Sequence, residues 1–226
     1  MENEIKIVNW PSFETLSLIA QQINPEINVA GVTTNQIPEL ISNLKDWYPA
    51  IQVGMESRHL SLNYYNDNCV LTDKGIGRTN LPLLVQSKDG LTIGFISFQA
   101  DPAARNLTSP LGIVNPNYRG KGIAYFGPNL LEAVGKKLQY SLVYYFVTLE
   151  TIAQQKVAEA LGFKIVGIFP SWDRDLIDGQ PQRVSEAAYA KSLNGSEATR
   201  LPIPTNLTEK TKKLWDFLFG DLKSNE

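Results

Sequence analysis

A glycine-containing loop between a strand-like and a helical stretch constrains this chain more than any other feature. Residues 115–127 read NPNYRGKGIAYFG. The preceding SPLGIV is apolar, as in a strand, and the following NLLEAVGKKL has apolar positions at helical spacing. Such a junction either binds a phosphate group or is an ordinary turn. The residues within it can be compared with known phosphate-binding motifs to distinguish these two interpretations.

Two common phosphate loops do not fit these residues. A Walker loop requires a glycine where Asn115 stands and a serine or threonine where Gly122 stands. A dinucleotide-binding fingerprint that starts at Gly120 would place its third glycine at Tyr125. Neither motif is therefore present.

Residues 119–124, RGKGIA, still have the chemistry of an anion site. The first N–H groups of a helix have no partner within the helix and carry the positive end of its dipole. Glycine lets a ligand approach the backbone, and Arg119 and Lys121 add charged donors. A basic turn on the surface explains the same residues equally well, so both interpretations stay open at this point.

The composition favours one main domain with a short appendage. The chain has 226 residues, is 43% hydrophobic and carries a formal net charge of -2, which gives no reason to expect nucleic acid or an anionic membrane as a partner. Its single cysteine, Cys69, and single histidine, His59, argue against a disulfide framework and a metal centre. We expect a half-buried thiol, an ordinary loop histidine and no metal. The N-terminus lacks an apolar signal core, so a cytoplasmic protein is expected.

The first third of the chain predicts a strand, two helices and a turn-rich segment. Residues 4–10 have the pattern of a strand, and amphipathic helices follow at 13–23 and 37–44. Residues 48–80 are polar and turn-rich, with a short strand at 69–71. This segment forms either a cover over a substrate site or a surface excursion.

Strands and helices alternate along the rest of the chain. The predicted elements are a hairpin of 81–87 and 91–100, a strand at 109–116, a helix after the glycine loop, a strand at 140–150, a helix at 151–161 and strands at 163–170 and 183–193. We therefore predict an α/β fold for residues 1–193, with a mixed, mostly antiparallel twisted sheet flanked by helices. Residues 194–226 are predicted to be a linker and a C-terminal helix.

Two stretches together resemble the GNAT superfamily of acyl-CoA-dependent N-acyltransferases. The first, IVNPNYRGKGIA, matches the family's pyrophosphate loop, Arg/Gln-x-x-Gly-x-Gly/Ala, at Arg119, Gly122 and Ala124. The second, TIAQQKVAEALGFKIVGIFP, is similar to the family's next helix, which ends before a strand in Gly-Phe, here Gly162-Phe163. The predicted order of elements agrees with the family over residues 4–193.

The resemblance implies a site for acyl-CoA, with acetyl-CoA as the default and a longer acyl-CoA as the alternative. The pantetheine arm would pair with the backbone of a strand that separates from its neighbour, and the pyrophosphate would lie on amides of the loop. A primary amine would then attack the acyl group directly in a ternary complex. The residues implied at the cofactor are Ile113, Val114, Arg119, Gly120, Lys121, Gly122, Ile123, Ala124, Thr151 and Gln154.

Three residues depart from the family's pattern. Thr151 stands where many members have asparagine, and Ala158 stands where many have the tyrosine thought to protonate the leaving thiolate. The pattern around Thr151 and Gln154 is most similar to the branch that acetylates ribosomal-protein N-termini. Pro128 falls inside the helix after the loop, where it removes a backbone hydrogen bond and predicts a kink.

The candidates for proton transfer are Tyr145 and Glu150. Tyr144 and Tyr145 are adjacent on a predicted strand, so only one of them can face the cleft, and a core role explains either. Glu150 follows this strand and could relay a proton or cap the next helix. Water could replace a missing acid, because a thiolate is a reasonable leaving group.

The acceptor is predicted from an aromatic, acidic hairpin. Residues 170–183 include Trp172, Asp173 and Asp175, which suit a cationic amine or a peptide; a solvated turn explains them as well. The leading function is therefore transfer of an acyl group, by default acetyl, to a small-molecule or protein amine by a monomer or homodimer. Fatty-acyl transfer to an amine side chain of a peptide and a non-catalytic acyl-CoA-binding module are the alternatives.

Overall fold

The computed structural model of the chain describes residues 8–74, 78–193 and 201–220. Its contacts divide the chain into two compact units, Met1–Asn194 and Gly195–Glu226. The first unit contains a seven-stranded sheet, and the second contains a 3-10 turn, η6 (Pro204–Asn206), and one described helix, α6 (Glu209–Phe219). No helix among the described residues is long and apolar enough to cross a membrane.

The sheet has the order β1-β2-β3-β4-β5-β7-β6. Its strands are β1 (Ile27–Gly31), β2 (Asn80–Ser87), β3 (Thr92–Asp101), β4 (Asn106–Val114), β5 (Leu142–Thr148), β6 (Lys164–Ile177) and β7 (Gln180–Ser192). All neighbours are antiparallel except β4 and β5, which are parallel and are joined through the helix α4 (Phe126–Lys137). The predicted α/β fold with a mixed, mostly antiparallel sheet is confirmed.

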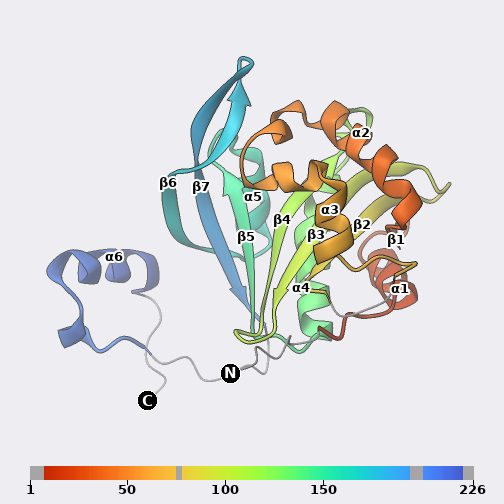
Figure 1. Ribbon diagram of the computed structural model, residues 1–226. Helices are drawn as coiled ribbons and strands as arrows, with labels where there is room; N and C mark the ends of the chain where they lie inside the picture. Colours follow the sequence, from red (N-terminus) through yellow and green to blue (C-terminus); the bar gives the residue numbers. More distant parts are fainter. Residues whose placement is uncertain (1–7, 75–77, 194–200, 221–226) are drawn as a thin grey trace, which may run out of the picture. The chain divides into compact units, whose positions relative to one another are not determined.

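Helices cover both faces of this sheet (Figure 1). The buried side chains of α1 (Phe13–Ile23), α4 and α5 (Ala153–Ala160) join one core cluster, and those of α2 (Ile37–Trp47) and α3 (Leu62–Asn68) join another. Successive strand residues serve the two clusters in turn: in β2, Leu84 belongs to the second cluster and Val85 to the first. The alternation follows from the two-residue repeat of a strand.

The strand expected at residues 4–10 is not found where it can be checked. Residues 1–7 lie outside the described residues, and residues 8–10 are not in a strand. Val8 and Trp10 are buried by packing into the first core cluster, and the Trp10 indole donates to the Arg78 carbonyl at 2.7 Å. The edge next to β2 is instead formed by β1, Ile27–Gly31, a short strand that the sequence pattern did not reveal.

Residues 48–74 and 78–80, the covering segment, are not a surface excursion. They include two 3-10 turns, η2 (Pro49–Gln52) and η3 (Met55–Leu60), together with α3. Ile51, Tyr65 and Leu71 are buried in the second core cluster, so the segment covers a face of the sheet. The short strand expected at 69–71 is reduced to isolated bridge residues at Cys69 and Leu71, and Cys69 pairs with Asn80.

Pro128 marks the beginning of α4 rather than a bend inside it. A 3-10 turn, η5 (Ile123–Tyr125), precedes the helix, which begins at Phe126. Pro128 is therefore the third helical residue, where an N–H group would have no partner within the helix. The predicted helix is confirmed. The kink predicted at Pro128 is not needed, because proline in the first turn of a helix removes no hydrogen bond within it.

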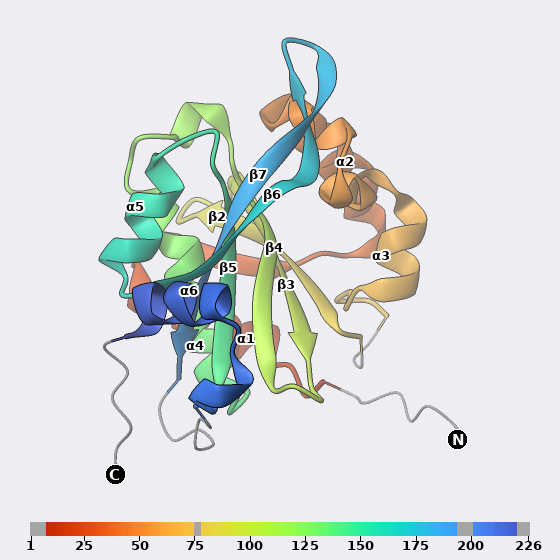
Figure 2. The same ribbon diagram turned by 90° about the vertical axis from the view of Figure 1, so that its left-hand side faces the viewer.

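The last two strands are longer than the sequence pattern suggested. Residues 171–177 belong to β6 and residues 180–182 to β7, with Asp178 and Gly179 in the turn. Both turn residues have positive φ, +50° and +74°. Figure 2 shows this hairpin end, residues 171–182, extending past its neighbours as a twisted arm, and β6 packs against η2.

Candidate functional site

The parallel strands β4 and β5 separate towards their carboxyl ends. Their pairing is confined to residues 106–108 of β4 and 142–144 of β5, although the strands continue to Val114 and Thr148. The separation begins at a bulge, where Phe98 of β3 faces both Ser109 and Pro110 of β4. Proline has no N–H group to donate to a ladder, and bulges disrupt pairing. Backbone groups of β4 beyond Pro110 are therefore not used to pair with β5.

A pocket opens beside this separation. It is bordered by β4, by parts of β2 and β3, by the first turns around α4, by the middle of β5 and by the first turn of α5. The residues predicted at the cofactor that line it are Ile113, Val114, Ile123, Ala124 and Gln154, and the predicted acid Tyr145 lines it too. Gly112 also lines the pocket, and a Cβ atom added to it would meet no atom within 4 Å. The backbone of β4 is thus accessible there.

The glycine loop presents unused amides. Gly120 and Gly122 both have φ of +76°, in the left-handed region that favours glycine, and open space surrounds their missing Cβ atoms. None of the described backbone hydrogen bonds outside regular elements uses the N–H groups of residues 120–122. Those of Ile123 and Ala124 begin η5, where a helix offers them no acceptor. A row of donors with room above it fits a pyrophosphate group.

The two charged residues of the loop have partners within the protein. Arg119 donates from Nε to the Val114 carbonyl at 3.1 Å and from Nη2 to the Trp47 carbonyl at 2.6 Å. Trp47 is the last residue of α2, so a cation there complements the helix dipole. The Lys121 ammonium lies 4.8 Å from the centre of the Tyr118 ring. Arg119 thus anchors the loop to α2.

Tyr145 is the predicted proton donor that reaches the pocket. Its hydroxyl donates to Gln154 Oε1 at 2.6 Å, and both residues line the pocket. Burial raises the pKa of Tyr145 to about 12, so the phenol is protonated at neutral pH and can act as a donor. Two other predicted residues lie elsewhere: Glu150 and Thr151 are exposed and do not line the pocket.

Ala158 does not face the pocket. Its side chain is fully buried in the first core cluster and is absent from the pocket lining. A tyrosine at this position would overpack the core rather than deliver a hydroxyl to the pocket. Among the described tyrosines, Tyr145 is the one that lines the pocket.

The predicted acceptor residues lie in β6 rather than in a solvated turn. Asp173 accepts a hydrogen bond from the Met55 N–H group at 2.8 Å, and Asp175 accepts one from the Tyr48 hydroxyl at 2.7 Å. Both carboxylates therefore tie the arm to the covering segment. Trp172 is 46% exposed and lies in a second bulge of β6, opposite Ser185.

Sequence reasoning missed an aromatic row and a carboxylate on this face of the sheet. The rings of Phe146, Phe169 and Trp172 follow one another, with centroids 6.2 Å and 5.0 Å apart. Glu186 of β7 pairs with Phe169 of β6 and with Thr148 of β5. A lone carboxylate within the apolar run of β7 was the signal that could have revealed it. Burial first, and then the charges of Asp173 and Glu56, raise the pKa of Glu186 to about 7.

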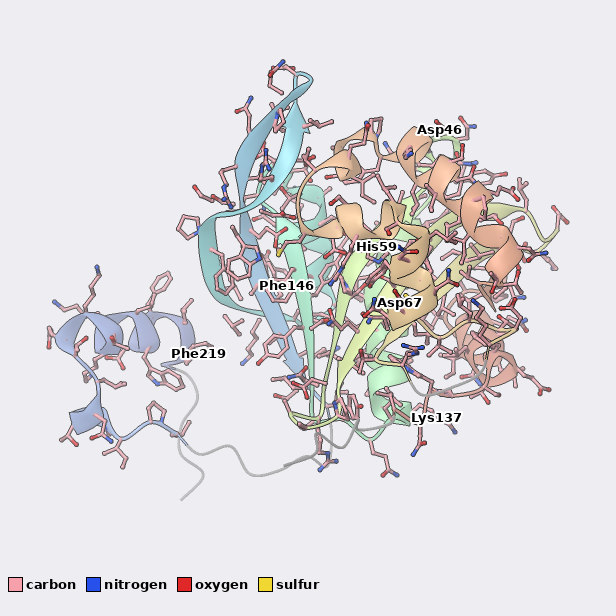
Figure 3. The ribbon with its side chains drawn as sticks, viewed as in Figure 1. Asp46, His59, Asp67, Lys137, Phe146 and Phe219 are labelled. Carbon is pink, nitrogen blue, oxygen red and sulfur yellow. The ribbon has the colours of Figure 1, made fainter. Side chains whose placement is uncertain are left out.

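His59 is not an ordinary loop histidine. Its side chain is fully buried, with Nδ1 3.0 Å from Glu56 Oε2 and Nε2 3.2 Å from Ser97 Oγ. Figure 3 shows it within the covering segment. Cys69 is buried rather than half-buried, and burial raises the pKa of its thiol to about 12, so the thiol is protonated at neutral pH.

Comparisons with known proteins identify the fold. No protein-family model and no curated protein matches the chain. Among solved structures, mutant forms of the spermidine/spermine N-acetyltransferase SpeG from Vibrio cholerae match with a TM-score of 0.58 and 16% identity, over 75% of this chain and 95% of that one. A putative phosphinothricin N-acetyltransferase matches with a TM-score of 0.55 and 14% identity, over 74% and 99%.

These likenesses show the fold and do not single out the ribosomal-protein branch. At 14–16% identity they establish the architecture and leave the reaction to be argued from the site. The chain has the fold of the GNAT N-acetyltransferases.

Proposed function

We propose that this protein is an acyl-CoA-dependent N-acyltransferase that moves an acetyl group to a primary amine. The observation that carries the proposal is the opening between β4 and β5, which leads to a loop of unpaired amides. Strand separation alone occurs in many folds, and an amide-rich loop alone is a general anion site. Ile123 and Ala124 of the loop line the same pocket as Ile113 and Val114 of β4, whereas residues 119–122 lie outside its lining. This arrangement suits a long ligand with a phosphate group near one end and a reactive carbonyl at the other.

The donor side would be held largely by backbone groups. N–H groups of residues 120–124 would bind the pyrophosphate, and the backbone of Ile113 and Val114 would hold the pantetheine arm. Bound acyl-CoA supplies an activated thioester carbonyl. Because Arg119 already anchors the loop to α2, it would keep these amides in a fixed arrangement. Fixed donors that hold a substrate in place accelerate a reaction because they do not have to reorganise during it.

Tyr145 is the proposed donor of a proton to the leaving sulfur. Its high pKa keeps the hydroxyl protonated, and its position in the pocket lining puts it on the donor side of the sheet. In this structure the hydroxyl donates to Gln154, so it would have to exchange that partner for the sulfur. Glu150 is exposed and outside the pocket, which favours Tyr145 of the two predicted residues.

The proposed acceptor is an amine with cationic character, either free or on a peptide. Rings and carboxylates on the face that carries Phe146, Phe169 and Glu186 suit such a group. Among the structural neighbours, SpeG is described as a spermidine/spermine N-acetyltransferase, which is consistent with an amine acceptor here.

A longer acyl group is the second candidate, because part of the pocket is apolar. Val85, Ile96 and Phe126 line it together with the β4 residues. If this lining accepts an acyl chain, each buried methylene would add about 0.8 kcal/mol of binding free energy. Competition of acetyl-, hexanoyl- and decanoyl-CoA for one site tests this. We expect acetyl-CoA to compete best, and affinity that climbs with chain length would favour the second candidate.

The proposal is tested by turnover of acetyl-CoA with a panel of mono-, di- and polyamines and lysine-containing peptides. We expect free CoA thiol and an amide product to form together with at least one of these amines. Tight CoA binding without turnover of any acyl-CoA would instead identify a non-catalytic binding module.

A further inference from the structure

Glu186 lies on β7, one strand away from the opening between β4 and β5 and outside the lining of the pocket. It is directly opposite Thr148, the last residue of β5, and paired residues of adjacent strands point to the same face of a sheet. Tyr145 and Val147 lie on the face of α4 and α5, since both pack with the first core cluster. Thr148 and Glu186 therefore point to the opposite face, across the sheet from the proposed acid.

Glu186 differs from the neighbouring carboxylates in having no donor. Asp173 accepts N–H groups from Met55 and Arg174, and Glu56 contacts Arg58 and His59. For Glu186, no hydrogen bond or ion pair is found among the described residues, although its side chain is half-buried.

The groups that surround Glu186 favour its accepting a proton. Asp173 from β6 and Glu56 from η3 face it with like charges, and the phenol of Tyr48, which donates to Asp175, lies near enough to interact with it. Phe169 is its partner on β6, and Phe146 precedes Thr148 on the same face of β5. A carboxylate in such surroundings binds a proton, or a cation that brings one, more readily than a solvated carboxylate does.

We propose that Glu186 is the general base that removes a proton from the ammonium form of the acceptor. The inference rests on the proposed N-acyl transfer and adds the residue that starts it. Placing the base on the face opposite Tyr145 separates the two proton transfers, one on each face of the sheet.

The protons and bonds balance in this arrangement. The ammonium group gives its first proton to the Glu186 carboxylate and becomes a nucleophilic amine. Its nitrogen then forms a bond to the acyl carbon as the carbon–sulfur bond breaks. A second proton leaves the nitrogen, and the sulfur receives one from Tyr145, which is reprotonated from that released proton. Glu186 returns its proton to solvent, so one proton is released for each amide formed.

The pKa of Glu186 suits this role. A carboxylate with a pKa of about 7 is mostly ionised at pH 8 and is still basic enough to accept a proton from an ammonium group. An ordinary glutamate, with a pKa near 4.5, is a much poorer proton acceptor. The raised value follows from burial and from the charges of Asp173 and Glu56.

The first test does not depend on turnover. Glutamate side chains labelled with ¹³C at the carboxyl carbon are titrated by NMR in the full chain. We expect one resonance with a midpoint near pH 7, which is lost in Glu186→Gln and kept in the control Glu26→Gln, an exposed carboxylate at the other end of the sheet. A spectrum in which every glutamate titrates below pH 5.5 overturns the proposal.

The second test measures the pH dependence of kcat/KM for the amine. The wild-type rate is expected to fall below pH 7, and Glu186→Gln is expected to lose about a hundredfold at pH 8 together with this acidic limb. Glu186→Asp should restore part of the rate, and calorimetric CoA affinity should stay within about twofold in all variants, as expected for a side chain that does not bind the donor.

Failure of the inference can be distinguished from failure of the proposed function. If the wild-type protein acylates an amine and Glu186→Gln keeps both its rate and its acidic limb, Glu186 is not the base and the transferase stands. If the wild-type protein acylates no amine, both proposals fall.

Discussion

At the scale of single residues, Gly122 offers a test of the proposal that the loop binds the donor. We predict that Gly122→Glu abolishes CoA binding, because its side chain would project a negative charge over the loop amides. Gly179→Glu is a matched control: its φ of +74° is close to the +76° of Gly122, and a Cβ atom added to either glycine would meet no atom within 4 Å. Both variants therefore have a similar backbone cost.

Calorimetry with CoA measures the loss of binding, and thermal unfolding of both variants measures the backbone strain. Together they distinguish a direct effect on CoA binding from a general loss of stability. The expected result is similar destabilisation of the two proteins, with binding lost in Gly122→Glu alone. Equal CoA affinity in the two folded variants would mean that the pyrophosphate lies somewhere else.

Tyr145 and Tyr144 offer a second comparison at this scale. They are neighbours on β5 with side chains on opposite faces, and the hydroxyl of Tyr145 bonds to Gln154 in the pocket. If Tyr145 is the acid, Tyr145→Phe should lower the maximal rate roughly a hundredfold, while Tyr144→Phe changes it little. Steady-state kinetics at saturating acetyl-CoA measures this. A loss of only a few-fold in Tyr145→Phe would show that water protonates the sulfur.

At the scale of elements, the sequence predicted those helices, strands and turns whose signals lie within a few consecutive residues. The β2–β3 hairpin, β4, the glycine loop, α4 and the Gly-Phe end of α5 carry their signals within a few residues. The pocket residues Ile113, Val114, Ile123 and Ala124 were implied by the family resemblance of β4 and the loop. For the tyrosine that faces the cleft, the sequence left a choice between Tyr144 and Tyr145. Strand alternation places their side chains on opposite faces of the sheet but does not say which face borders the cleft.

Non-local packing explains the elements that the sequence concealed. β1 is a five-residue strand that can be recognised only by its pairing with β2. The covering segment is buried because it packs on the face of the sheet that carries the second core cluster. The carboxylates of Asp173 and Asp175 resemble a solvated turn in sequence, yet partners more than a hundred positions away hold them in β6. Glu186 escaped notice because its surroundings come from three distant segments.

The tie between the arm and the covering segment can be tested as an element. Tyr48→Phe removes the hydroxyl that donates to Asp175, a hydrogen bond to a charged group worth about 1.5–3 kcal/mol. We expect faster hydrogen–deuterium exchange in residues 173–177 and lower stability. Tyr140→Phe is the control, because this tyrosine precedes β5 and belongs neither to the arm nor to the covering segment. Unchanged exchange in the arm of Tyr48→Phe would show that the strand pairing alone holds it.

At the scale of the whole molecule, Glu186 links the site to the stability of the fold. Its pKa is raised from 4.5 to about 7 in the folded protein, so between these values the folded state binds more protons than the unfolded state. The contribution of this group to stability is therefore full below pH 4.5, falls as pH rises and is lost above pH 7. A residue kept at such a cost is typical of a functional site.

Removing the charge should therefore stabilise the protein, but only where Glu186 would be ionised. A shift of this size corresponds to roughly 3 kcal/mol if fully expressed, and solvent screening of a half-exposed side chain reduces the expectation to about 1–2 kcal/mol. We predict that urea unfolding gives Glu186→Gln a higher free energy of unfolding than wild type at pH 8 and an equal one at pH 4.5, with Glu26→Gln unchanged at both. Since the same substitution is expected to abolish the acidic limb of the rate profile, gain of stability and loss of activity should appear over the same pH range. A Glu186→Gln protein that is less stable than wild type at pH 8 would mean that the carboxylate is held by favourable partners, and neither its raised pKa nor its role as a free base could then be maintained.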